Sequence, residues 1–337
     1  MNPTWQRFLQ QQGAHCDAQG CAHFAERLHS PEGSAAEGAL CDLSHEGLIS
    51  VTGPDAQTFL QGQLTQDLRK VGPSCSPLAA YCSGKGRVLA VIRVGSQTPQ
   101  SYWLRLPAAC VDAVIKRLRM YVLRAQVVLT VASEEVVGLG LVGEKAVRAV
   151  ESGSGVTLPQ EVDATKPVGE LQYIRLPGAI PRFLVQGTPS AAATLWQPLA
   201  PVLRLTDVAF WDGLEIQAGI PVIVPDTSDK FVPQMLNLEK LGAVSFTKGC
   251  YVGQEIVARS QYLGEVKRRL FTLQGAGALP QLGERVYGLL GQEQGVGEII
   301  RVAPARETGG FIALAVMNQD APRQLSLGNG ITLNRVG

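Results

Sequence analysis

The last 73 or so residues of the chain limit its fold most strongly, because they hold five short apolar runs and show no helical period. The runs cover residues 268–273, 284–290, 295–302, 311–317 and 331–335. Gly and Pro separate them, and both residues favour turns between strands. Five or six such strands predict a small antiparallel β-barrel, which we place at residues 263–337.

Upstream of the barrel, one order of elements occurs twice: strand, helix, hairpin, helix. The first set is predicted at residues 48–52, 53–64, 78–94 and 111–118, with a closing strand at 126–131. The second set is predicted at residues 137–142, 144–150, 171–186 and 191–196, and a further helix capped by Thr206 or Asp207 follows. We therefore predict an α+β fold, with a duplicated α/β body at 36–135 and 136–262 and a C-terminal antiparallel β-barrel.

Composition narrows the classes of partner. The formal net charge is +1, which gives no global attraction to nucleic acid or to an anionic membrane. No apolar stretch reaches the ~18 residues of a membrane helix, and the polar start is not a secretory signal. The seven cysteines are an odd number without framework spacing, which favours a reducing compartment. We expect a cytoplasmic protein that makes no membrane contact.

Histidine chemistry is restricted to the N-terminus, because all four histidines lie within the first 45 residues. A Ser-His-Asp or Cys-His arrangement would have to take its base from this region. The cluster of His15, Cys16, Cys21 and His23 has four residues between its cysteines, and no second ligand pair follows at finger distance. The spacing therefore favours a segment that merely contains these residues, and we predict no metal site.

The segment most suited to chemistry is residues 246–259, FTKGCYVGQEIVAR. Gly249 permits a left-handed or crowded backbone just before Cys250. A helix starting at Tyr251, with Ile256 and Val257 inward, would place Cys250 at a helix N-terminus. Both this position and the charge of Lys248 favour a thiolate. The alternative is that Cys250 is a small buried residue in a tight turn.

The contiguous run KGCYVGQE at 248–255 resembles the motif of the YgfZ-type folate-binding proteins, which are relatives of the glycine-cleavage aminomethyltransferase (T-protein) and of a mitochondrial iron–sulfur assembly factor. Further blocks are similar to that family: SVTGPDA at 50–56, FLQGQLT at 59–65, KGR at 85–87, AGIP at 218–221 and PQMLNL at 233–238. About the first 35 residues lie outside the resemblance.

This resemblance implies three subdomains around an opening that receives tetrahydrofolate or another reduced folate. It implies that Cys250 is the functional thiol and that Lys248 acts beside it. The folate contacts that it implies come from the following residues: Tyr251, Gln254, Glu255, Arg259, Lys85, Arg87 and, for the glutamate tail, alternatively Lys267. Glu255 and Arg259 are four apart, so a plain surface ion pair explains them equally well.

Two departures from the family pattern bear on activity. The aminomethyltransferases carry an aspartate-rich turn whose carboxylate serves the one-carbon chemistry, whereas residues 82–87 here read CSGKGR. A helix that shows Arg-Ile-Glu in the family reads Glu-Ile-Gln at 215–217. The first departure argues against aminomethyl transfer, and the second argues against a folate contact from that helix.

The leading expectation is therefore an accessory protein for iron–sulfur cluster assembly or repair. Its partners would be iron–sulfur assembly proteins or client iron–sulfur enzymes, and its link to tRNA modification would be indirect. The alternative is a tetrahydrofolate-dependent aminomethyl (one-carbon) transferase. Direct tRNA binding by the basic runs at 116–119 and 267–269 is disfavoured, because the net charge is near zero.

Overall fold

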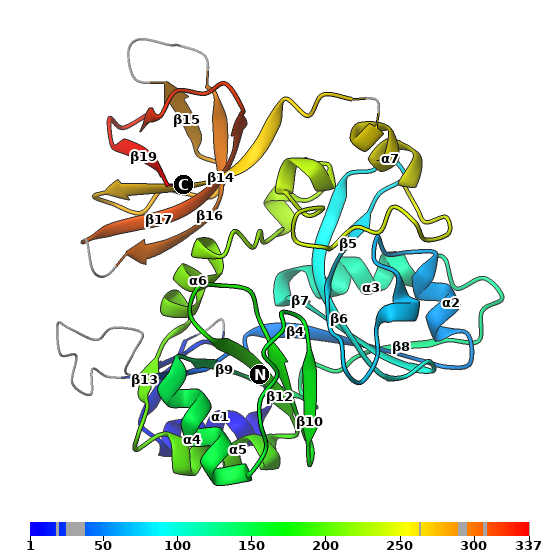
Figure 1. Ribbon diagram of the computed structural model, residues 1–337, viewed down its shortest axis with the longest axis vertical. Coiled ribbons are helices and arrows are strands. Elements are labelled where there is room, and N and C mark those ends of the chain that lie inside the picture. The colour runs from blue at the N-terminus through cyan, green and yellow to red at the C-terminus, as the bar shows by residue number, and fades with distance from the viewer. Residues whose placement is uncertain (18–19, 25–37, 263, 289–294, 306–308, 337) are drawn as a thin grey trace. The chain divides into compact units, whose positions relative to one another are not determined.

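The computed structural model describes residues 1–17, 20–24, 38–262, 264–288, 295–305 and 309–336 (Figure 1). Predictions at residues 36–37, where the first domain was expected to begin, and at 289–290, the end of one expected strand, lie outside these ranges. The fold class is confirmed: two mixed α/β sheets are followed by a closed antiparallel barrel. Among the described residues, none of the helices has both the length and the apolar character that spanning a membrane requires.

The duplication predicted from the sequence is present and is more complete than expected. Each copy runs strand, helix, three strands, helix, strand. The first copy comprises β4 (Glu46–Thr52), α2 (Ala56–Gln61), β5 (Leu78–Cys82), β6 (Val88–Thr98), β7 (Ser101–Pro107), α3 (Val111–Arg119) and β8 (Val128–Val131). The second comprises β9 (Val137–Val142), α4 (Glu144–Ser154), β10 (Thr165–Val168), β11 (Leu171–Arg175), β12 (Arg182–Gly187), α5 (Pro189–Leu199) and β13 (Arg204–Thr206).

The sheet orders show the same relationship. The first sheet runs β5-β6-β7-β4-β8, and the second runs β10-β11-β12-β9-β3-β13. Corresponding strands occupy corresponding places, except that β3 (Ala39–Asp42) is inserted next to β9 and pairs in parallel with β13. The sequence did not predict β3, β10 or β13, because each has only three or four residues and too short an alternation to recognise.

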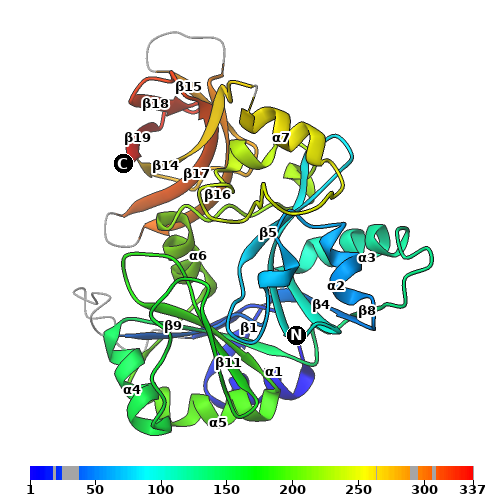
Figure 2. The same ribbon diagram turned by 45° about the vertical axis from the view of Figure 1, so that its right-hand side comes forward.

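The barrel closes in the order β14-β17-β16-β15-β18-β19, and β14, β16 and β17 form its longest wall (Figure 2). Its strands are β14 (Arg268–Ala276), β15 (Arg285–Gly288), β16 (Gly297–Ala305), β17 (Gly310–Asn318), β18 (Gln324–Leu327) and β19 (Thr332–Val336). The sequence missed β18, which has four residues. The remaining helices and strands are α1 (Pro3–Gln11), β1 (Ala14–Cys16), β2 (Ala22–Phe24), α6 (Val208–Gln217) and α7 (Gln254–Tyr262).

The chain forms two compact units, and each is assembled from three separate stretches. Unit 1 contains Met1–Gln57, Arg69–Pro77 and Arg93–Trp211. Unit 2 contains Thr58–Leu68, Leu78–Ile92 and Asp212–Gly337. The division cuts through α2, β6 and α6, so the two units do not coincide with runs of sequence.

Unit 1 has its core between the six-stranded sheet and helices α1, α4 and α5, which cover one face of that sheet (Figure 1). Trp5 of α1 stacks on Phe8 and meets Trp196 of α5 edge to face. Aromatic pairs of this kind add to the burial of their large apolar surfaces. The helix α1, which the sequence did not predict, is thus part of this core.

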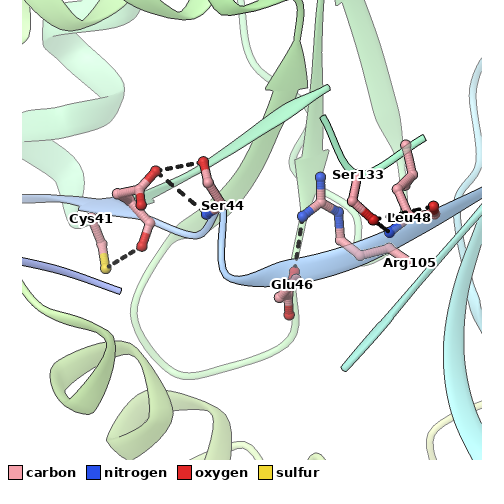
Figure 3. Close-up of polar contacts among 7 residues, drawn as sticks. Cys41, Ser44, Glu46, Leu48, Arg105 and Ser133 are labelled. Carbon is pink, nitrogen blue, oxygen red and sulfur yellow. Dashed lines mark hydrogen bonds and ion pairs between the residues drawn. The ribbon is translucent and has the colours of Figure 1, made fainter. Parts of the chain in front are cut away.

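A polar turn joins β3 to β4 in unit 1 (Figure 3). The buried Asp42 accepts hydrogen bonds from Ser44 Oγ at 2.7 Å and from Trp5 Nε1 at 2.8 Å. Burial raises the pKa of Asp42, and the hydrogen bonds from Ser44 and Trp5 oppose that rise. Four residues further along, Glu46 pairs with the buried Arg105 of β7 at 3.0 Å. This turn therefore holds α1 against the sheet through a buried carboxylate.

Unit 2 has a second apolar core, which joins β5, the first part of β6, α7 and the outer face of the barrel. Val257 of α7, Phe231 and Leu270 of β14 are all buried in it. A separate cluster, which includes Phe311 and Leu333, fills the inside of the barrel. Because barrel strands contribute to both clusters, the barrel is packed on both sides within unit 2.

Candidate functional site

Lys248 is the centre of the segment that carries the family motif, and its ammonium group is buried. Its Nζ donates hydrogen bonds to the carbonyl oxygens of Gln61, Leu64 and Gln66, at 2.6, 2.6 and 2.8 Å. The same ammonium lies 5.2 Å from the centre of the Tyr251 ring, a cation–π distance. Three carbonyl oxygens match the three N–H donors of an ammonium. Lys248 therefore binds the end of α2 and the loop that follows it.

The same loop is attached to the segment before the motif. Thr65 Oγ1 donates to the carbonyl of Ala243 at 2.7 Å and accepts from the N–H of Ala80 at 2.7 Å. The N–H of Val252 donates to the carbonyl of Gly62 at 3.2 Å. Two blocks that resemble the family, at 59–65 and 248–255, are therefore hydrogen-bonded to one another within unit 2.

The third block, the β5–β6 turn, packs directly against the motif. A Cβ atom on Gly253 would lie 2.4 Å from the Ser83 carbonyl oxygen, and one on Gly86 would lie 2.8 Å from Ile256 Cβ. Both glycines have positive φ, +82° and +66°. Contacts this close exclude any side chain, so these two glycines let the turn and the motif touch.

The helix of the motif begins later than the sequence indicated. α7 starts at Gln254 rather than at Tyr251, because the left-handed Gly253 cannot belong to a right-handed helix. Val257 is buried as predicted, but the prediction for Ile256 is wrong, since 37% of its surface is exposed. The role assigned to Gly249 belongs to Gly253 instead: Gly249 has no positive φ and no atom within 4 Å of an added Cβ.

These facts change the predicted surroundings of Cys250. It lies four residues before the first residue of α7, and the ammonium of Lys248 is taken up by three carbonyl groups. Neither source of thiolate stabilisation expected from the sequence is therefore present in the predicted form. What distinguishes Cys250 is access, because of the seven cysteines it alone is exposed. The alternative of a small buried residue is wrong.

Four of the other thiols lie in environments that oppose ionisation. Burial raises the pKa of Cys82 to about 12, and the nearby Asp229 carboxylate adds to the rise. Burial likewise raises the pKa of Cys16, Cys75 and Cys110. Cys110 is buried, as the sequence predicted. A reagent or partner that needs an accessible thiol will therefore meet Cys250 first.

The predicted folate-contacting residues differ in their exposure to solvent. Tyr251 is buried. Its burial raises the pKa of its hydroxyl, and the nearby Cys82 adds a smaller rise. The half-buried Gln254 side chain accepts a hydrogen bond from the Tyr251 N–H at 3.3 Å. The exposed side chains are Lys85, Arg87, Glu255 and Arg259. Of these, Arg87 donates to the carbonyl of Lys230.

Sequence reasoning missed Asp229, which brings a carboxylate to the β5–β6 turn from 146 residues away. Ser83 Oγ donates to Asp229 Oδ1 at 2.7 Å, and the N–H of Asp229 donates to the carbonyl of Val88 at 2.9 Å. Asp229 is one of three non-glycine residues with positive φ among those described. The turn that has no carboxylate in its own sequence thus acquires one from another segment.

Glu215, which stands where the family pattern has an arginine, has an ion-pair partner within unit 2. Arg301 of β16 lies 2.5 Å from Asp212 and 3.6 Å from Glu215, and it donates to the carbonyl of Ile220 at 3.0 Å. The acidic residues of α6 therefore bind the barrel. No signal in the sequence links positions 215 and 301, which are far apart along the chain.

The basic run at 267–269 is also largely engaged. Arg269 pairs with Glu239, and Arg268 lies 3.7 Å from Glu298, leaving Lys267 as the exposed member. Among the described residues, no group of three or more His, Cys, Asp or Glu side chains is placed to hold a metal ion. Within the described ranges, Cys250 therefore belongs to no such group.

Comparison with known proteins shows the structural class to which this fold belongs. A model of the GCVT N-terminal domain matches residues 32–166. The crystal structure of glycine cleavage system aminomethyltransferase T from Bartonella henselae superimposes with a TM-score of 0.79 and covers 98% of this chain and 95% of that one. At 18% identity this likeness establishes the fold, which is that of the glycine-cleavage aminomethyltransferases.

Curated relatives define the family. The tRNA-modifying protein YgfZ of Edwardsiella ictaluri is 35% identical over 81% of this chain and 82% of its own length. That of Cronobacter sakazakii is 33% identical over 83% and 85%, and that of Colwellia psychrerythraea is 34% identical over 69% and 71%. The chain belongs to the YgfZ family.

Proposed function

We propose that this chain is a folate-binding accessory protein for iron–sulfur cluster assembly or repair, which supports tRNA modification through iron–sulfur enzymes. The observation that carries the proposal is the exposed Cys250, which lies between the buried Lys248 and the buried Tyr251 in a hydrogen-bonded motif. One cysteine does not provide the four ligands of a stable cluster, so the thiol would bind a cluster only together with a partner. Client enzymes or assembly proteins would supply the remaining ligands.

The residues of unit 2 fit a folate in two respects. Folate has a hydrogen-bonding pterin and a glutamate tail with carboxylates. Gln63 Oε1 is buried without a partner among the described residues, and it would accept a hydrogen bond from a pterin N–H. The exposed Lys85 and Arg259 have no ion-pair partner in the described part of the chain, and they would meet the carboxylates. Glu255 would serve as a second pterin acceptor.

Binding would be tested by calorimetry with tetrahydrofolate and 5-formyltetrahydrofolate. We expect Gln63→Ala and the double variant Lys85→Ala/Arg259→Ala each to weaken binding by at least about tenfold, since each removes partners of a polar or charged group. Lys166→Ala changes an exposed lysine of unit 1 and should leave binding unchanged. Wild-type protein that binds neither folate would remove the folate half of the proposal.

The iron–sulfur part of the proposal would be tested in a strain from which the gene for this protein has been deleted. Cys250→Ala should fail to restore the activity of iron–sulfur enzymes and the level of tRNA modifications that depend on them. Cys110→Ser removes a buried thiol that has no proposed role, and it should restore both wherever the protein accumulates. Full restoration by Cys250→Ala would show that the thiol is dispensable.

A second candidate function, aminomethyl transfer to tetrahydrofolate, is favoured by Asp229. The sequence argued against it because the β5–β6 turn has no carboxylate, yet Asp229 Oδ1 lies 2.7 Å from Ser83 Oγ in that turn. A reconstituted glycine-cleavage assay would decide between the two. Turnover that Asp229→Asn abolishes while folate binding persists would establish the transferase, and no turnover in the wild type would leave the accessory role.

A further inference from the structure

The segment 116–131, which comprises the end of α3, the connection to β8 and β8 itself, exposes large apolar side chains. Met120 is 61% exposed, Leu123 86%, Val128 59% and Val131 49%. Single exposed apolar residues are ordinary, but Met120 and Leu123 lie only three positions apart where α3 ends, and Val128 and Val131 follow on opposite faces of β8. A surface of this kind costs free energy in water and is typical of a place where another molecule binds.

The same segment is strongly basic. Lys116, Arg117, Arg119 and Arg124 lie in it, and neither Asp nor Glu occurs between residues 113 and 133. Four positive charges in this stretch compare with a formal net charge of +1 for the whole chain. The remainder of the molecule must therefore be slightly acidic, and this segment stands out electrostatically.

The exposure does not come from poor packing of the helix. Val114, Ile115 and Leu118 of α3 are buried, so α3 already has a covered apolar face. Arg119 Nη2 donates to the carbonyl oxygen of Leu129 at 2.9 Å, which ties the end of α3 to β8. In the order of its sheet β8 is an edge strand, and β4 is its one partner among the described strands (Figure 1). The apolar and basic side chains are thus presented from a fixed backbone.

We propose that segment 116–131 is a docking surface for an acidic protein segment that also carries apolar side chains. The positive charges call for an anionic partner, and Met120 and Leu123 call for apolar groups between its charges. A nucleic acid meets the first requirement only. Proteins bind unpaired bases by stacking them on aromatic rings, and the one aromatic ring of this segment, Tyr121, is partly buried, while its fully exposed large residues are not aromatic. The inference goes beyond the proposed function and does not depend on folate or on Cys250.

Fluorescence anisotropy with three probes of equal charge tests the chemistry of the partner. The probes are a peptide alternating Glu with Leu, a Glu/Ser peptide of the same length, and a single-stranded RNA. We expect the Glu/Leu peptide to bind at least about tenfold more tightly than the other two. Lys116→Glu/Arg124→Glu and Leu123→Ser should each reduce its affinity by about tenfold or more, whereas Lys166→Glu and Leu279→Ser, exposed elsewhere, should not.

A photo-crosslinker at position 123, in cells, tests whether the surface is used. The expected result is a crosslink to a protein segment rich in Asp and Glu with apolar residues between them, lost in Lys116→Glu/Arg124→Glu. The same crosslinker at position 279 is the control. The proposal is overturned by tighter binding of the RNA, by peptide affinity that the segment's variants do not change, or by crosslinks at 123 that match those at 279. Each of these outcomes leaves the folate and thiol tests unaffected.

Discussion

Lys248 and Cys250 are two residues apart but differ in their exposure to solvent. The sequence placed Lys248 beside the Cys250 thiol as an electrostatic activator, yet its ammonium is buried among three carbonyl oxygens while Cys250 is exposed. The motif was recognisable from the sequence, but the partners of Lys248 were not. They lie 182 to 187 residues away, and backbone carbonyls leave no mark on a sequence.

Lys248 should therefore matter for stability more than for reactivity. Lys248→Met keeps most of the apolar stem but removes three charge-assisted hydrogen bonds, and we expect a loss of about 3 kcal/mol in the free energy of unfolding of unit 2. Urea-dependent labelling of the buried Cys82 reports on that unit. Lys166→Met, at an exposed site, should change nothing measurable. An unchanged midpoint in Lys248→Met would mean that the three carbonyl contacts contribute nothing.

The thiols should label in an order set by access. We expect iodoacetamide to modify Cys250 first at pH 7.5 and Cys82 last, because Cys82 is buried and its pKa is raised to about 12. Peptide mapping after timed quenching gives the order, and Cys250→Ala identifies the first peptide without ambiguity. Labelling of Cys110 as fast as that of Cys250 in folded protein would contradict the access argument.

At the scale of elements, prediction found most of the long patterns, with the nine-residue α1 as an exception, and missed most of the short ones. The periodic apolar face of α3 and the alternating runs of the barrel were found from the sequence, whereas three- and four-residue strands such as β13 and β18 were not. The start of α7 was misplaced by three residues because the choice between two nearby glycines depends on contacts. Gly253 approaches Ser83 of a turn 170 residues earlier, and only the fold brings the two together.

Those two glycines form a matched pair for experiment. Gly253→Ala places a Cβ 2.4 Å from the Ser83 carbonyl oxygen at a φ of +82°, so we expect a loss of about 3 kcal/mol in the free energy of unfolding and displacement of the β5–β6 turn. Gly249→Ala meets no atom within 4 Å and should stay within about 0.5 kcal/mol of the wild type. Urea denaturation of the two variants gives the comparison, and equal midpoints would refute it.

At the scale of the whole molecule, the two units can be followed separately, because all four tryptophans (Trp5, Trp103, Trp196 and Trp211) belong to unit 1. Their fluorescence reports on unit 1, while the accessibility of Cys82 reports on unit 2. The three-domain division at 36–135, 136–262 and 263–337 stays a prediction, which limited proteolysis with mass spectrometry would test.

Unit 1 should respond to pH through Asp42. Burial raises its pKa in the folded state, so folded protein holds this proton more tightly than unfolded protein does. The stability that it contributes is complete below the unfolded value of about 3.9 and is lost as pH rises through the folded value. Asp42→Asn cannot ionise and still offers an oxygen to Trp5 and Ser44.

We therefore expect the variant to gain stability relative to wild type as pH rises from 4 to 7, as measured by urea unfolding followed by tryptophan fluorescence. Asp112→Asn changes an exposed carboxylate of α3 and serves as the control. Parallel pH profiles of Asp42→Asn and wild type would show that Asp42 does not govern this dependence.

The interleaving of the two units also has a consequence for how the chain is made. The loop that supplies the carbonyls for Lys248 leaves the ribosome before its lysine exists, since Leu64 and Lys248 are 184 residues apart. At ordinary elongation rates that interval lasts about 9 to 37 s, which is far longer than a hairpin needs to form. Throughout it, the nascent β5–β6 hairpin has no α7 and no barrel to cover its apolar face. We therefore expect nascent chains to bind chaperones during this interval, and slowing elongation over residues 93–211 should lower the yield of native protein in a strain that lacks ribosome-associated chaperones.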